Sequence, residues 1–167
     1  MQINIQMEVN ETGSNAIKDA LKSQLGGGAG PLYDVFIRSA EAVRSHLYNR
    51  FISGADWPPL AASTIKRKGH NRILQDTMIM LGALTPSFIG LPGQYQNFSN
   101  GNMEIGIAGY TYMNGMPIET VVNIHQNGLG NNPRREIFVA PDEPTITQIT
   151  KNFDDAITQI IEVNNVK

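Results

Sequence analysis

The stretch that decides the fold spans residues 31–52 and reads PLYDVFIRSAEAVRSHLYNRFI. Its apolar side chains recur every three or four residues, at Leu32, Val35, Phe36, Ala40, Val43, Leu47 and Phe51. This spacing places them along one side of an α-helix. Pro31 suits the first helical position, where a missing N–H is tolerated. The pattern predicts a long central helix of about 30 Å.

A second amphipathic helix is expected over residues 143–162, after Pro144 has opened it. The apolar residues of this segment follow the same helical spacing: Ile146, Ile149, Phe153, Ile157, Ile160 and Ile161. Asp142 and Glu143 precede them, and carboxylates are favourable near the positive N-terminal end of a helix. The two long helices are therefore expected to bury their apolar faces in one core.

Three short segments have the pattern of strands. Residues 2–10 alternate between polar and apolar side chains, and so do residues 103–107. Residues 137–140 form a short apolar run that ends at Pro141. A further helix is predicted over residues 14–25, before the glycine-rich run 26–30, which we interpret as a hinge.

Two interpretations remain open for the segment that follows residue 107. In the first, the chain turns at Asn114-Gly115 and returns as a strand over residues 118–122, which makes a hairpin. In the second, residues 121–126 form a helical turn that ends at Asn127-Gly128. The sequence pattern does not separate the two.

Residues 53–101 lose regular periodicity and contain several prolines, so we expect a long, mobile loop region with short helices at 62–67 and 77–84. This region is expected to become ordered when it meets a neighbouring subunit. The order of elements lacks a regular βαβ alternation and predicts an α+β fold. The prediction is a single domain over residues 1–167, with both long helices packed on a small, mostly antiparallel sheet.

The composition excludes several classes of protein. The net charge of -2 argues against a surface that is basic throughout, and the absence of cysteine excludes disulfides and thiolate metal sites. No apolar run reaches the roughly 20 residues that span a membrane. The first residues lack the pattern of an export signal, so assembly in the cytoplasm is expected.

The sequence predicts neither an enzyme nor a cofactor or metal site. His46, His70 and His125 are the three histidines, and none has the spacing of a zinc motif. The glycine run 26–30 lacks the lysine of a phosphate-binding loop. We therefore expect no small-molecule substrate, and we interpret His125 and Gln126 as hydrogen-bonding residues that fix the turn before Gly128.

Five segments, taken in order, resemble the virion-morphogenesis family of tailed phages, which includes tail-completion proteins of Mu-like and related contractile-tailed phages. The segments are YNRF at 48–51, WPPLAASTIKRKGH at 57–70, ILQDT at 73–77, IHQNG at 124–128 and PRREIFV at 133–139. The resemblance covers residues 1–162. It implies a structural protein of the virion tail or neck that acts in tail completion or head–tail joining. It also implies partners: other copies arranged as a ring, and phage tail and neck proteins.

Basic residues mark the expected interaction surface. Four of the 13 lysines and arginines fall between positions 66 and 72, and two more are adjacent at 134–135. The residues concerned are Lys66, Arg67, Lys68, Arg72, Arg134 and Arg135. Such a cluster has two interpretations: a solvated loop, or a surface that contacts packaged DNA or an acidic neighbouring subunit. Pairing of the basic loop with the acidic C-terminal helix of another copy is one form of the second interpretation.

Trp57 is the only tryptophan and also has two interpretations. It anchors the loop region on the core, or it is an aromatic contact for a partner. The alternative function from another class is a small DNA-binding protein that uses the basic loop 66–72, whose affinity would fall steeply with salt.

Overall fold

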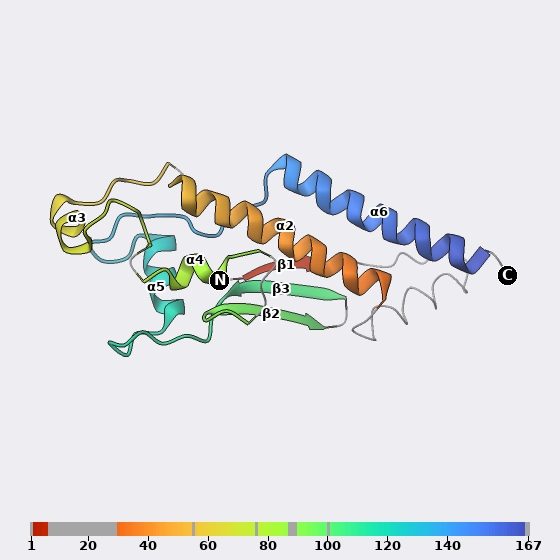
Figure 1. The fold of residues 1–167 in the computed structure, drawn as a ribbon, viewed down its shortest axis with the longest axis horizontal. Coiled ribbons are helices and arrows are strands. Elements are labelled where there is room, and N and C mark those ends of the chain that lie inside the picture. The colour runs from red at the N-terminus through yellow and green to blue at the C-terminus, as the bar shows by residue number, and fades with distance from the viewer. Residues whose placement is uncertain are drawn as a thin grey trace. The chain divides into compact units, whose positions relative to one another are not determined.

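The computed structural model has an α+β architecture, as the sequence predicts. It describes residues 2–6, 30–54, 56–75, 77–86, 90–99 and 101–165. Strand β3 (Asn102–Ile107) lies between β1 (Gln2–Gln6) and β2 (Gln94–Ser99), and β2 and β3 are antiparallel (Figure 1). The predicted helix 14–25 and the glycine run 26–29 lie outside the described residues. Within the described residues, no helix combines the length and apolar character that crossing a membrane requires.

Helix α2 (Pro31–Ser53) confirms the prediction for the central helix. Every residue of its apolar stripe is buried, and the most accessible of them, Phe51, is 1% exposed. The Asp34 N–H donates to the carbonyl of Gly30 at 3.0 Å, which starts the helical pattern just before Pro31. The three-and-four spacing therefore decides both the helix and its buried face.

The chain divides into two compact units, and α2 contributes residues to both. We call residues 1–3, 44–95 and 105–140 the first unit, and residues 4–43, 96–104 and 141–167 the second unit. Whether they behave as one domain in solution stays a prediction.

The second unit is built on aromatic packing around Phe36. The Phe36 ring lies 5.1 Å from that of Phe98 on β2 and 5.1 Å from that of Phe153 on α6 (Glu143–Asn165). Tyr33 packs edge-on against Phe98 at 5.2 Å. Helix α6 buries Ala156 and Ile160 on the same side as Phe153. The predicted C-terminal helix is therefore confirmed, but its predicted apolar stripe is only partly buried: Ile160 is 4% exposed, whereas Ile146 is 45% exposed.

The first unit packs helices α4 (Ile79–Ala83) and α5 (Ile118–Asn127) near the end of β2. Gly93 has φ +78°, and a Cβ at this position would lie 2.9 Å from Ile118 Cδ1 and 3.5 Å from Ile79 Cγ2. Only glycine combines this left-handed backbone with so close an approach. Helix α3 (Ala62–Lys68) agrees with the expected helix at 62–67.

The structure corrects three details of the sequence prediction. The loop region 53–101 contains β2, a strand that we did not predict. The Asn114-Gly115 turn exists, since Tyr112 N–H donates to the Met116 carbonyl at 3.0 Å, but the chain then enters α5, so the hairpin interpretation is wrong. Residues 137–140 are not a strand. The N–H groups of Ile137 and Phe138 donate to a side chain, so they have no need of a neighbouring strand.

Candidate functional site

The first unit has a groove of about 910 Å³. We call it the cationic groove. Five stretches of chain line it, each through some of its residues: 59–68, 74–80, 110–116, 121–125 and 131–135. Four of the five segments that carry the family resemblance contribute lining residues, namely those at 57–70, 73–77, 124–128 and 133–139. Tertiary folding thus brings segments from distant parts of the sequence to one surface.

Helix α3 supplies two of the groove's cations, Arg67 and Lys68. The helix ends at Gly69, whose φ of 75° is left-handed and whose N–H donates to the Ile65 carbonyl at 2.8 Å. Basic residues in the last turn are favourable beside the negative end of the helix dipole. Lys68 Nζ donates to the Arg72 carbonyl at 2.8 Å, which ties the helix end to the following loop.

Arg135 supplies the third cation and is held rigidly. It is 5% exposed. Its Nη2 donates to the Pro58 carbonyl at 3.1 Å, and its backbone N–H donates to the His125 carbonyl at 2.7 Å. Its Nε is buried and has no hydrogen-bond partner among the described residues. Burial lowers the pKa of Arg135, yet a guanidinium stays charged at neutral pH.

His125 lies beside these cations and is neutral at pH 7. Burial lowers its pKa from the ordinary value of 6.5, and the positive charges of Arg135 and Lys68 lower it further. Its Nδ1 is buried without a hydrogen-bond partner among the described residues. No group of three or more potential metal ligands occurs in the described part of the chain. In this setting His125 offers the groove a neutral hydrogen-bonding group.

Methionine and tyrosine form the apolar part of the groove. Met80, Met113 and Met116 line it, and Met113 is fully exposed. Tyr110 and Tyr112 stack edge to face with their ring centroids 5.3 Å apart. Burial raises the pKa of Tyr112 above its ordinary value, opposed by a hydrogen bond with Thr77. Flexible methionines beside rigid aromatics make a surface that adapts to different apolar side chains.

Among the described residues that line the groove, none is an aspartate or a glutamate. With His125 neutral, Arg67, Lys68 and Arg135 give the lining three positive charges and no negative one.

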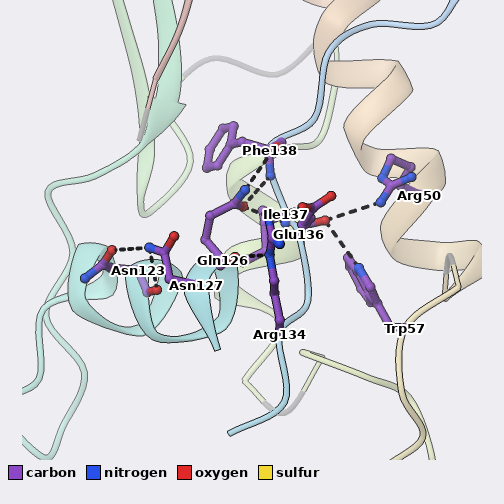
Figure 2. A network of polar contacts seen from close by, with 9 residues as sticks. All are labelled: Arg50, Trp57, Asn123, Gln126, Asn127, Arg134, Glu136, Ile137 and Phe138. Atoms are coloured by element: carbon purple, nitrogen blue, oxygen red, sulfur yellow. Dashed lines mark hydrogen bonds and ion pairs between the residues drawn. The ribbon is translucent and has the colours of Figure 1, made fainter. Parts of the chain in front are cut away.

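A polar network centred on Gln126 supports the segment that carries Arg135 (Figure 2). Gln126 Oε1 accepts the N–H groups of Ile137 and Phe138, each at 2.8 Å. Gln126 Nε2 donates to the Phe138 carbonyl at 2.9 Å. We expected Gln126 to fix the turn before Gly128, but its side chain holds residues 137 and 138, eleven and twelve positions further along the chain.

Trp57 anchors the loop after α2. Its Nε1 donates to the Glu136 carbonyl at 3.2 Å, and Arg50 Nη2 donates to the same oxygen at 3.4 Å (Figure 2). Its ring packs edge to face on Phe51 at 5.2 Å. These contacts agree with the anchoring interpretation of Trp57 and give its indole N–H an internal partner.

The predicted interaction residues do not all meet in the groove. Lys66 and Arg72 are exposed but do not line it, and Arg72 lines a separate hollow of about 530 Å³ next to Tyr48 and Ile73. Arg134 pairs with Glu136, and its Nε donates to the Gln126 carbonyl at 3.4 Å. Met113, Met116 and the tyrosine pair were missed, because their chain segment had been interpreted only as a turn.

No family model matches the chain, and neither a curated protein nor a solved structure matches it. The resemblance to the virion-morphogenesis family therefore stays a prediction, and the α+β fold is what the structure establishes.

Proposed function

We propose that this chain is a non-enzymatic structural protein of a tailed phage or prophage, which acts in tail completion or head–tail joining in the virion. Its copies associate through oppositely charged surfaces. The observation that carries the proposal is the separation of charge between the two units. The resemblance of the five sequence segments is the second support.

The charges of the described residues are distributed unequally. In the first unit, eight lysines and arginines stand against three carboxylates, a net charge of +5. In the second unit, two basic residues stand against eight carboxylates, a net charge of -6. The chain as a whole is close to neutral, at -2. A subunit with one basic and one acidic unit favours head-to-tail contact with another copy, which is a heterologous interface.

The exposed charges that such a contact needs are present on both units. Lys66 and Arg67 are exposed on α3 in the first unit. Asp154 and Glu162 are exposed on α6 in the second unit, eight residues apart and thus near one side of the helix. Long-range attraction between such surfaces speeds association and is screened by salt.

A charge-exchange experiment tests the proposal. One variant carries Lys66→Glu and Arg67→Glu, and a second carries Asp154→Lys and Glu162→Lys. Light scattering is expected to show that the wild type forms oligomers at low salt and that each variant alone does not. A mixture of both variants is expected to associate again, because the reversed basic surface of one meets the reversed acidic surface of the other.

A control places one charge reversal on each unit away from these side chains, with Arg72→Glu in the first and Asp34→Lys in the second. This pair is expected to associate like the wild type. If the wild type stays monomeric at all salt concentrations, or if the mixture of the exchange variants does not associate, the electrostatic account is wrong.

The charge of +5 on the first unit also favours a second candidate function, which is DNA binding through the basic segment 66–72. Fluorescence anisotropy with a labelled DNA duplex separates the two. Assembly without DNA binding is the expected result. Tight duplex binding by the monomeric Asp154→Lys, Glu162→Lys variant, with an affinity that falls steeply with salt, would favour the DNA-binding function instead.

A further inference from the structure

We propose that Asn114 is a site of spontaneous deamidation, in which the backbone nitrogen of Gly115 attacks the side-chain amide and converts Asn114 to aspartate or isoaspartate. Asn114 is among the residues that line the cationic groove, so the reaction adds a carboxylate to this surface. The inference goes beyond the proposed function and does not depend on it.

The reaction uses only the two neighbouring residues and water. The Gly115 nitrogen gives up its proton to solvent hydroxide and forms a bond with Asn114 Cγ. The Cγ–Nδ2 bond breaks, and Nδ2 takes up a proton from water and leaves as ammonia, so that a cyclic imide remains. Water then opens the imide at Cγ to give aspartate, or at the backbone carbonyl carbon to give isoaspartate. Because the attack is intramolecular, it needs no partner molecule.

The turn over residues 112–116 exposes the reacting groups and supports the charge that develops on them. Asn114 and Gly115 are both exposed. Met116 N–H donates to Asn114 Oδ1 at 3.1 Å, and Oδ1 is the oxygen that becomes negative when Cγ is attacked. A backbone N–H in this position stabilises the negative charge. Gly115 has φ +80°, and a Cβ there would meet no described atom within 4 Å, so its nitrogen has room to approach Cγ.

The pair Asn127-Gly128 has the same sequence in a setting that opposes the reaction. Asn127 is the last residue of α5, and its Nδ2 donates to the Oδ1 of Asn123 at 2.7 Å and to the Asn123 carbonyl at 3.2 Å. The leaving nitrogen is therefore held by two hydrogen bonds. A Cβ at Gly128 would lie 2.9 Å from the backbone nitrogen of Arg134, so the backbone is closely packed where the imide would form.

The hydrogen bonds of the two attacking nitrogens do not distinguish the pairs. Gly115 N–H donates to the Tyr112 carbonyl at 2.8 Å, and Gly128 N–H donates to the Ile124 carbonyl. The difference lies in the side-chain amides and in the space around each glycine. Because two hydrogen bonds of Asn127 Nδ2 must break before it reacts, Asn114 is expected to lose its amide at least about tenfold faster.

Peptide mapping measures the two sites separately. A protease that cuts after glutamate releases residues 105–119, in which Asn114 is the only asparagine, and residues 120–136, which contain Asn127. The folded protein is incubated in mildly alkaline buffer, and mass spectrometry follows the replacement of each amide by a carboxyl group. Fragmentation of the second peptide assigns the loss to Asn127. The chain unfolded in guanidinium is the reference, and there the two rates are expected to be similar because the folded contacts are gone.

Two outcomes would overturn the inference. The first is that the folded protein keeps the amide of Asn114 under conditions in which the unfolded chain loses it. The second is that the ratio of the two rates is the same in the folded protein and in the unfolded chain, because the turn would then have no part in the reaction.

Two variants provide matched controls. Asn123→Ala removes the shorter hydrogen bond of Asn127 Nδ2, so Asn127 is expected to react about fivefold faster while Asn114 is unchanged. An unchanged rate at Asn127 would count against the inference. Asn114→Asp carries the charge of the product, and the reacted wild type is expected to elute with it from an anion exchanger. Absence of such a species after incubation would also overturn the inference.

Discussion

Gln126 holds Phe138 through both ends of its side-chain amide: Nε2 donates to the Phe138 carbonyl at 2.9 Å, and Oε1 accepts the Phe138 N–H at 2.8 Å. Oε1 also accepts the Ile137 N–H. Gln126 is 7% exposed, and both partners are buried. A glutamine side chain here meets the hydrogen-bonding needs that a neighbouring strand would otherwise meet.

Replacement of Gln126 by alanine is expected to lower the free energy of unfolding by about 3 kcal/mol, because it leaves buried backbone groups without partners at about 1–3 kcal/mol each. Urea denaturation measures the change. Asn123→Ala is the matched control, since Asn123 is on the same helix and exposed, and it is expected to cost about 0.5 kcal/mol or less. If both variants lose the same free energy of unfolding, the hydrogen bonds of Gln126 do not contribute more to stability than an exposed side chain does.

Two glycines after α5 provide a second matched pair. Gly128 has φ +66°, and a Cβ there would lie 2.9 Å from the backbone nitrogen of Arg134. Gly130 has φ +65°, but its Cβ would meet open space. Both Gly→Ala changes incur the cost of a left-handed backbone, about 1 kcal/mol, and only Gly128→Ala also displaces backbone.

The expected result is that Gly128→Ala lowers the unfolding free energy by at least about 1 kcal/mol more than Gly130→Ala does. Because Arg134 precedes Arg135, the displaced segment is also the one that supplies a cation to the groove. Thermal denaturation of the two variants in parallel checks the prediction, which fails if their midpoints coincide.

Two substitutions at Trp57 separate its packing from its hydrogen bond. Trp57→Phe keeps an aromatic ring against Phe51 and loses the bond to the Glu136 carbonyl, so a loss of about 1 kcal/mol is expected. Trp57→Ala loses both and is expected to cost about 2–3 kcal/mol, because the side chain is half-buried. Guanidinium denaturation followed by circular dichroism measures both. A fully stable Trp57→Ala would mean that Trp57 is not an anchor.

The stability of the protein is expected to fall with pH below about 6.5 because of His125. Its pKa is lowered in the folded state by burial and by the nearby cations, whereas the unfolded value is the ordinary 6.5. Between the two values the unfolded chain binds more protons than the folded chain does. The free energy of unfolding therefore rises with pH through this window, and the destabilisation appears as pH falls below 6.5.

Urea denaturation from about pH 5 to about pH 7.5 tests this prediction, because histidine side chains gain and lose their proton in this range. The variant His125→Asn is expected to show a smaller decrease at acid pH than the wild type. Identical pH profiles for the two proteins would show that His125 does not contribute.

The extent to which the sequence predicted the fold differs between helices and strands. Helices α2 and α6 were predicted almost to the residue, because an apolar stripe repeated over many turns is visible in the chain itself. Strand β2 was missed because its sequence, QYQNFS, lacks the regular alternation of apolar and polar residues that indicates a strand. Residues 137–140 have a strand-like composition, but the backbone N–H groups of Ile137 and Phe138 donate to the side chain of Gln126 on α5 and not to a neighbouring strand.

The candidate site shows the same limit. The cations Arg67, Lys68 and Arg135 were predicted as interaction residues from charge clustering, which is a local property. Their companions Met113, Met116 and Tyr112 were not, because nothing in the local sequence shows that a turn will lie beside α3. Lys66 and Arg72 belong to the same cluster but do not line the groove.

The sequence by itself determined the two long helices, the buried face of α2, the α+β class and the charge of each segment, since all of these follow from periodicity and composition within short stretches. Only the tertiary structure decided that a glutamine on α5 would satisfy the backbone at Ile137 and Phe138, and that five separated stretches would line one groove. The physical reason is that such contacts join residues far apart in the chain, whose meeting depends on the packing of the whole unit rather than on local spacing.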